Sequence, residues 1–152
     1  MRKKIFIVLG IIIGLVCTSA VGIAVTTMNA PKHPSEYHIG IDYNEALKSD
    51  KPMLAVFYVD WCSYCLKFMP KFNLLSKLYG NKYNFVMINV EGSKQNMNLA
   101  KDVSLGGFPT VYILDPKYDN RVLLSNGIYQ DLVKFRTELD RYLRIRSILD
   151  KN

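Results

Sequence analysis

Residues 60–65 read DWCSYC, and residues 106–110 read GGFPT. The two cysteines of the first stretch, Cys62 and Cys65, can form a structural disulfide, supply half of a metal site or act as a redox-active pair. The apolar run MLAVFYV (53–59) precedes them, as expected of a strand buried on both faces, and apolar residues at helical spacing follow them. The sequence therefore places the pair where a buried strand ends and a helix begins.

A zinc site finds little support elsewhere in the sequence. Zinc needs four ligands, and no second C-x-x-C and no H-x-x-x-H motif is present to complete a set with Cys62 and Cys65. His33 and His38 lie five residues apart without a nearby cysteine or carboxylate cluster, so metal binding is not expected there. Cu(I) needs only two thiolates, which leaves a soft-metal carrier open as an alternative.

A purely structural disulfide is also disfavoured, because a bridge across two residues constrains the unfolded chain very little. At the first turn of a helix, unpaired backbone N–H groups and the helix dipole stabilise negative charge. The pKa of the Cys62 thiol is therefore expected to be lowered, which suits a nucleophile. Cys65, one turn further along, is expected to be more buried and to act as the resolving thiol. We predict a redox-active disulfide that needs no other cofactor and no metal.

The N-terminal segment has the pattern of an exported or membrane-anchored protein. MRKK (1–4) carries three positive charges, and the run from Ile5 to Val25 is apolar and long enough to cross a hydrocarbon core of roughly 30 Å. Residues 1–28 are therefore predicted to be a signal peptide or a membrane anchor, and the length of the run favours the anchor. Either way, the basic residues stay in the cytoplasm and the rest of the chain is delivered outside it, where disulfides persist.

The remaining chain divides into a linker and one domain. Residues 29–41 are largely polar, contain two prolines and are predicted to be a linker. Residues 42–152 alternate helical and strand-like patterns in the order αβαβαββα, which predicts an α/β domain with a mixed central sheet flanked by helices. The predicted elements are a helix from Asp42, strands at 53–59, 84–90, 110–114 and 121–125, and helices at 65–80, 93–105 and 130–149.

The formal net charge of +7 does not indicate a nucleic-acid partner. Three of the basic residues belong to MRKK, and many others alternate with acidic residues in the predicted last helix, as on a solvated helix face. No aromatic–basic motif supports nucleic-acid binding, so we expect none.

Several of these features occur together in one known family. DWCSYC, Pro70 five residues after Cys65, GGFPT and Gly127 before the last predicted helix resemble the thioredoxin superfamily over about residues 42–146. The approach KPMLAVFYVDWC is most similar to periplasmic thioredoxin-like thiol reductase domains, including the C-terminal domain of the membrane electron-transfer protein DsbD. The resemblance implies a thioredoxin fold and thiol–disulfide exchange with protein clients.

The resemblance also implies roles for individual residues. Pro109 matches the cis-proline that faces the cysteine pair, and the backbone of Phe108 would pair with an extended substrate peptide. Trp61 matches an aromatic residue beside the nucleophile that forms one wall of the substrate groove. Gly127 matches a glycine that allows close approach of the substrate, and Pro70 matches the proline within the active-site helix.

At three positions the sequence departs from the family. The buried acid of thioredoxins, six residues before the first cysteine, is replaced by Val56, and the lysine that often accompanies it by Met87. The related reductase domains carry a glutamate in the active-site helix where this chain has Met69. Asp60 is close in sequence, but the strand pattern does not give the direction of its side chain. The usual buried proton acceptor for Cys65 is therefore absent, and water is expected to carry the proton.

The dipeptide inside the motif, Ser63 and Tyr64, bears on the direction of electron flow. Strong oxidants of the superfamily place positive charge near the pair, and Ser-Tyr supplies none, so the pair is expected to be reducing. We therefore predict an extracytoplasmic thiol–disulfide oxidoreductase, a reductase or electron relay for protein disulfide or dithiol clients, supplied by a membrane electron-transfer donor. The alternative is a thioredoxin-fold binding or Cu(I)-delivery module with little exchange activity.

Overall fold

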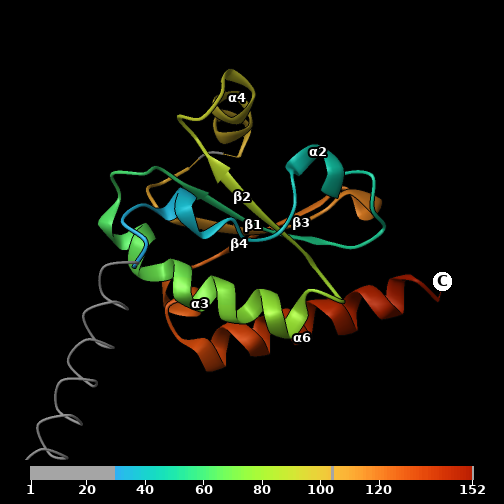
Figure 1. Ribbon diagram of the computed structural model, residues 1–152. Helices are drawn as coiled ribbons and strands as arrows, with labels where there is room; N and C mark the ends of the chain where they lie inside the picture. Colours follow the sequence, from blue (N-terminus) through green and yellow to red (C-terminus); the bar gives the residue numbers. More distant parts are fainter. Residues whose placement is uncertain (1–29, 104, 152) are drawn as a thin grey trace, which may run out of the picture. The chain divides into compact units, whose positions relative to one another are not determined.

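The strands of the domain form one mixed sheet (Figure 1). The computed structural model describes residues 30–103 and 105–151, and the chain divides into two compact units, Met1–Lys32 and His33–Asn152, of which the second holds the sheet. The strands lie in the order β2-β1-β3-β4, with β1 parallel to β2 and antiparallel to β3, and with β4 antiparallel to β3, which confirms the predicted mixed sheet. Their bounds are β1 Met53–Tyr58, β2 Asn84–Asn89, β3 Thr110–Asp115 and β4 Asn120–Leu124.

Helices cover both faces of this sheet (Figure 1). The two long helices, α3 (Ser63–Tyr79) and α6 (Leu132–Leu149), lie along one face, and α2 (Tyr43–Ala46) and α4 (Lys94–Asp102) lie over the other. Three short helical turns complete the domain, namely η1 (Pro34–Tyr37), η2 (Pro116–Tyr118) and α5 (Asn126–Tyr129).

β1 is buried on both faces, which explains its continuous apolar sequence. Successive side chains point to opposite faces of a strand, so its residues divide between two core clusters. The side chains facing α3 and α6 are Leu54, Val56 and Tyr58, and those facing α2 and α4 are Met53, Ala55 and Phe57. Core packing on both faces of the sheet therefore holds the carboxyl end of β1, just before the cysteine pair.

The predicted linker is packed against the domain over much of its length. Within residues 29–41, Ile39 is buried in the core, and the N–H of Ile41 donates to the carbonyl of Phe85 on β2 at 2.9 Å. Gly40 has φ +83°, and an added Cβ there would collide with the Phe85 carbonyl, so only glycine lets the chain pass so close to β2. The polar composition of residues 29–41 predicted a linker. In the structure, a few apolar residues and Gly40 hold the later part of this segment against the sheet.

The predicted segment 1–28 lies outside the described residues. Across the part of the chain that is described, no helix combines the length and the apolar character needed to cross a membrane.

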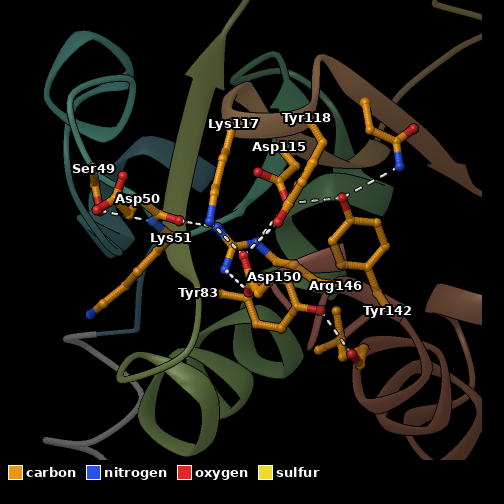
Figure 2. Close-up of polar contacts among 12 residues, drawn as sticks. Ser49, Asp50, Lys51, Tyr83, Asp115, Lys117, Tyr118, Tyr142, Arg146 and Asp150 are labelled. Carbon is orange, nitrogen blue, oxygen red and sulfur yellow. Dashed lines mark hydrogen bonds and ion pairs between the residues drawn. The ribbon is translucent and has the colours of Figure 1, made fainter. Parts of the chain in front are cut away.

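The C-terminal helix is tied to the end of the sheet by a buried ion pair (Figure 2). Arg146 Nε donates to Asp115 Oδ2 at 2.8 Å, and the Tyr142 hydroxyl donates to the same oxygen at 3.1 Å. The side chain of Asp115 is completely buried, and Arg146 also donates to the backbone carbonyl of Asp50. Burial and the charge of Asp115 raise the pKa of Tyr142 to about 12, so its hydroxyl remains a donor at neutral pH.

We expect Asp115→Asn to lower the free energy of unfolding by about 3 kcal/mol, because it removes the buried counter-charge of Arg146 and leaves only the more exposed Asp150, at 3.4 Å. The matched change Glu138→Gln weakens a surface pair with Arg141 on the same helix and should cost less than about 1 kcal/mol. Urea unfolding followed by circular dichroism measures both. Equal small losses in the two variants would show that the buried pair does not hold α6 in place.

Candidate redox site

Cys62 and Cys65 lie at the junction of β1 and α3 and form a disulfide. Their Cα atoms are 5.2 Å apart, and the N–H of Cys65 donates to Cys62 Sγ at 3.1 Å. Cys62 is the N-cap of α3 and is 7% exposed, whereas Cys65 has no exposed surface. An approaching thiol or disulfide therefore meets Cys62 first.

The start of α3 favours negative charge on the Cys62 sulfur. The first backbone N–H groups of a helix have no partner within the helix, and the positive end of its dipole lies there. The first turn of α3 contains no acidic side chain to oppose this field. The backbone alone therefore stabilises a thiolate on Cys62 relative to the thiol.

Phe108 packs against the core cluster that contains both cysteines, and the Phe108–Pro109 peptide bond is cis, as the resemblance implied. The Phe108–Pro109 loop, the end of β4 and Tyr129 of α5 line a hollow of about 320 Å³. Trp61 is 71% exposed and meets the ring of Phe108 edge-on, with the ring centroids 6.4 Å apart. Both aromatic side chains are thus placed next to the cysteines, on the solvent side.

Two hydroxyl groups hold this loop. The Thr110 hydroxyl donates to the carbonyl of Gly107 at 2.6 Å, and the Tyr129 hydroxyl donates to the carbonyl of Pro109 at 2.9 Å. The carbonyls on either side of Phe108 are therefore both engaged. Among the described residues, no backbone hydrogen bond engages the N–H or the C=O of Phe108 itself.

Glu91 is a site residue that the sequence did not point out. Its two carboxylate oxygens accept a hydrogen bond from Trp61 Nε1, at 3.1 and 3.2 Å, and so fix the plane of the indole. Glu91 comes two residues after β2, which runs parallel to β1. The carboxyl ends of parallel neighbouring strands meet at one edge of a sheet. An acid shortly after β2 was therefore the sequence signal that could have placed Glu91 near the residues that follow β1.

Asp60 stabilises the loop before the cysteines. One carboxylate oxygen accepts the N–H of Ser35 at 3.1 Å, and the other accepts Asn89 Nδ2 at 3.0 Å. The side chain therefore joins η1, the active-site loop and β2. The sequence left the direction of the Asp60 side chain open, and in the structure both of its carboxylate oxygens accept hydrogen bonds from these partners.

Asp115 is the only acidic residue that is buried among the described residues, and it pairs with Arg146 at the end of β3. Val56 and Met69 are fully buried in the core cluster that holds both cysteines, and Met87 packs against them. Burial and the nearby charge of Asp60 raise the pKa of Tyr58 to about 12, so this phenol stays protonated at neutral pH and cannot accept a proton. The positions where the family carries its ionisable residues are thus apolar here, and the lack of a proton acceptor for Cys65 stays a prediction.

The remaining predicted site residues lie on the surface around the pair. Ser63 and Tyr64 are exposed, and the Lys67 ammonium lies 5.9 Å from the centre of the Tyr64 ring. Pro70 lies within α3 and is exposed. Gly127 belongs to α5, where an added Cβ would meet nothing within 4 Å, so packing does not demand glycine there and its substrate role stays a prediction.

The sequence profile of the thioredoxin family matches residues 36–135, a span that contains the disulfide, the Phe108–Pro109 loop and the whole sheet. The chain belongs to the thioredoxin family. Its fold is also that of solved thioredoxin structures, such as the Trx4 domain of ERdj5, which aligns with a TM-score of 0.55. That alignment has 19% identity over 68% of this chain and 95% of the other, a likeness that concerns the fold alone.

Three curated thioredoxin-like relatives are similar over part of their length. A thioredoxin domain-containing protein (R362) of Acanthamoeba polyphaga mimivirus is 30% identical over 62% of this chain and 29% of its own. The chloroplastic thioredoxin-like protein HCF164 of Arabidopsis thaliana is 36% identical over 49% of this chain and 28% of its own. The thiol:disulfide interchange protein TxlA of Synechococcus elongatus is 32% identical over 48% of this chain and 38% of its own. The chain thus spans about a third of these relatives.

The chain thus combines membership of the thioredoxin family with a disulfide between the two cysteines of its C-x-x-C motif. Among the described residues, no three His, Cys, Asp or Glu side chains come together in a metal-binding arrangement.

Restoring an acid at position 56 tests the proton-transfer deficit. We expect Val56→Asp to speed the attack of Cys65 on a mixed disulfide about tenfold or more at neutral pH, because a positioned base accelerates such steps. Stopped-flow measurement of product release after mixing with a disulfide substrate reports this rate. Val56→Asn is the matched control, since it places a polar group of the same size in the same buried position without a base. Equal rates in the two variants would show that proton removal does not limit the step.

Proposed function

We propose that this thioredoxin-family chain is an extracytoplasmic thiol–disulfide oxidoreductase that acts mainly as a reductase or electron relay. The observation that carries the proposal is the disulfide at the start of α3 between Cys62, which keeps 7% of its surface exposed, and Cys65, which has no exposed surface. Only the Cys62 sulfur is accessible to a partner, and the Cys65 sulfur lies behind it in position to re-form the disulfide. A groove with an unengaged Phe108 backbone beside this pair fits an extended peptide segment of a client protein.

The exchange proceeds in two steps that balance in sulfur bonds and protons. In the reduced protein, the Cys62 thiolate attacks one sulfur of a client disulfide, forms a mixed disulfide and releases the other client sulfur as a thiolate. Cys65 then gives its proton to water and attacks the Cys62 sulfur. The client leaves with two thiols, and the Cys62–Cys65 disulfide carries the oxidation. A donor dithiol must reduce this disulfide before the next cycle.

The reducing direction rests on the surroundings of the pair. Ser63 and Tyr64 are uncharged, and Val56 and Met69 present an apolar interior to the sulfurs. Strong oxidants of this chemistry stabilise their thiolate with additional positive charge, which here is limited to the helix N-terminus. The nearest cation in the helix, Lys67, lies over the outer Tyr64 ring. The reduced form of the pair is therefore stabilised less than in a strong oxidant, which makes the pair more reducing.

Location and donor are inferred from the N-terminal sequence and the relatives. The basic start and apolar run of residues 1–28 support export, with an anchor favoured by length. The names of the chloroplastic HCF164 and of the interchange protein TxlA are compatible with work outside the cytoplasm. A membrane electron-transfer protein is the donor that this placement requires.

Trapping of clients tests the exchange role directly. We expect Cys65→Ser to accumulate mixed disulfides with client proteins, because Cys62 attacks and no second thiol resolves the bond. Cys62→Ser, the matched control, removes the accessible sulfur and should trap few. Non-reducing electrophoresis of both variants, expressed at full length in cells, quenched with acid and then alkylated, measures the yield. If neither variant captures a partner, a general exchange role is wrong.

The reduction potential of the Cys62–Cys65 pair decides the direction. We expect a value near roughly −270 mV, as in reducing members of this chemistry, rather than near −120 mV, as in strong oxidants. Equilibration with glutathione or dithiothreitol buffers, read from the emission of the single tryptophan beside the pair, gives the potential. Tight Cu(I) binding in a competition titration, together with no reduction of insulin, would instead favour the metal-delivery alternative.

A further inference from the structure

The short helix α5 lies between the two halves of the redox site. On one side it meets the active-site helix α3, where the Lys71 ammonium donates to the carbonyls of Tyr129 and Gln130. The ring of Phe68 on α3 also packs edge-on against the ring of Tyr129, with centroids 5.4 Å apart. On its other side, α5 reaches the Phe108–Pro109 loop.

Tyr129 makes the contact on that second side. Its side chain is buried, and its hydroxyl donates to the carbonyl of Pro109 at 2.9 Å. The same residue therefore joins the helix that begins at the cysteines to the loop that forms the opposite wall of the groove. The position of Tyr129 is therefore held by the Lys71 hydrogen bonds to α5, by the packing of its ring on Phe68 and by its hydroxyl bond to Pro109.

This arrangement has two consequences for a client peptide. The distance between the Cys62 sulfur and the loop depends on a buried contact rather than on a mobile surface chain. The Pro109 carbonyl is also occupied, so a client N–H that approached it would compete with an existing bond. A client strand is thereby directed to the backbone of Phe108, one residue earlier.

We infer that Tyr129 is a positioning residue for peptide clients, which sets the place and the register of the client-binding loop relative to Cys62. The inference rests on the proposed exchange function and adds a residue that acts through the Phe108–Pro109 loop without touching the reacting sulfurs. Substrates that use the loop depend on Tyr129, and a small disulfide that reacts with Cys62 alone does not. Misplacement of a bound group by a fraction of an ångström is sufficient to slow such reactions.

Tyr129→Phe removes only the hydroxyl and keeps the ring against Phe68. We expect the second-order rate of the reduced protein with insulin to fall about fivefold to tenfold, the effect of one lost hydrogen bond. The rate with 2-hydroxyethyl disulfide, which has no peptide backbone, should stay within about twofold. The reduction potential of the Cys62–Cys65 pair should remain that of the wild type, since the sulfurs are not touched.

Tyr112→Phe is the matched control. Tyr112 is a buried tyrosine whose hydroxyl donates to the carbonyl of Val103 at 2.6 Å, on the face of the sheet away from α3. Its loss should lower stability to a similar extent, and the insulin and small-disulfide rates should keep their wild-type ratio. Urea unfolding of both variants shows how much of any change follows from stability alone.

The outcomes separate this inference from the function on which it rests. A wild-type protein that reduces neither substrate would overturn the exchange function, and the role of Tyr129 with it. An active wild type whose Tyr129→Phe variant keeps the insulin to small-disulfide ratio would overturn only the positioning role. The positioning role is also wrong if Tyr112→Phe changes that ratio equally, because the effect then reflects general loosening of the domain.

Discussion

The burial of β1 on both faces is the constraint on which the rest of the structure depends. Its alternate side chains enter two separate core clusters, so the strand cannot slide or rotate without exposing one of them. The chain then leaves the sheet at Tyr58 and starts α3 at Ser63, with Cys62 as the N-cap between them. A rigid strand therefore fixes where the nucleophilic sulfur lies, and the helix fixes the field that acts on it.

Two acids hold the loop between β1 and α3 through hydrogen bonds. Asp60 joins the loop to η1 and β2, and Glu91 orients the indole of Trp61. The one fully buried carboxylate among the described residues, Asp115, is committed to Arg146 at the far end of β3. These three carboxylates thus form hydrogen bonds or an ion pair that hold elements of the domain together. The interior next to the cysteines is apolar, which favours slow proton release from Cys65.

The two ends of the sheet are secured by different interactions. At the end away from the cysteines, an ion pair fastens α6 to β3 and to the turn before β1 (Figure 2). At the redox end, Tyr129 and Thr110 hold the Phe108–Pro109 loop through hydroxyl-to-carbonyl bonds. Neutral hydrogen bonds near the sulfurs leave the local potential to the backbone of α3, whereas a charged pair there would alter it.

The sequence by itself determined the class of fold and the identity of the reacting residues. Continuous apolar runs and helical spacing predicted the strands and the long helices, and the C-x-x-C pair after a buried strand predicted the nucleophile, because these signals are local in the chain. Tertiary structure decided which distant groups meet: Glu91 with Trp61, and Tyr129 with Pro109. It also docked the predicted linker on β2. A hydrogen-bond partner tens of residues away depends on how the elements pack, and no local pattern encodes that choice.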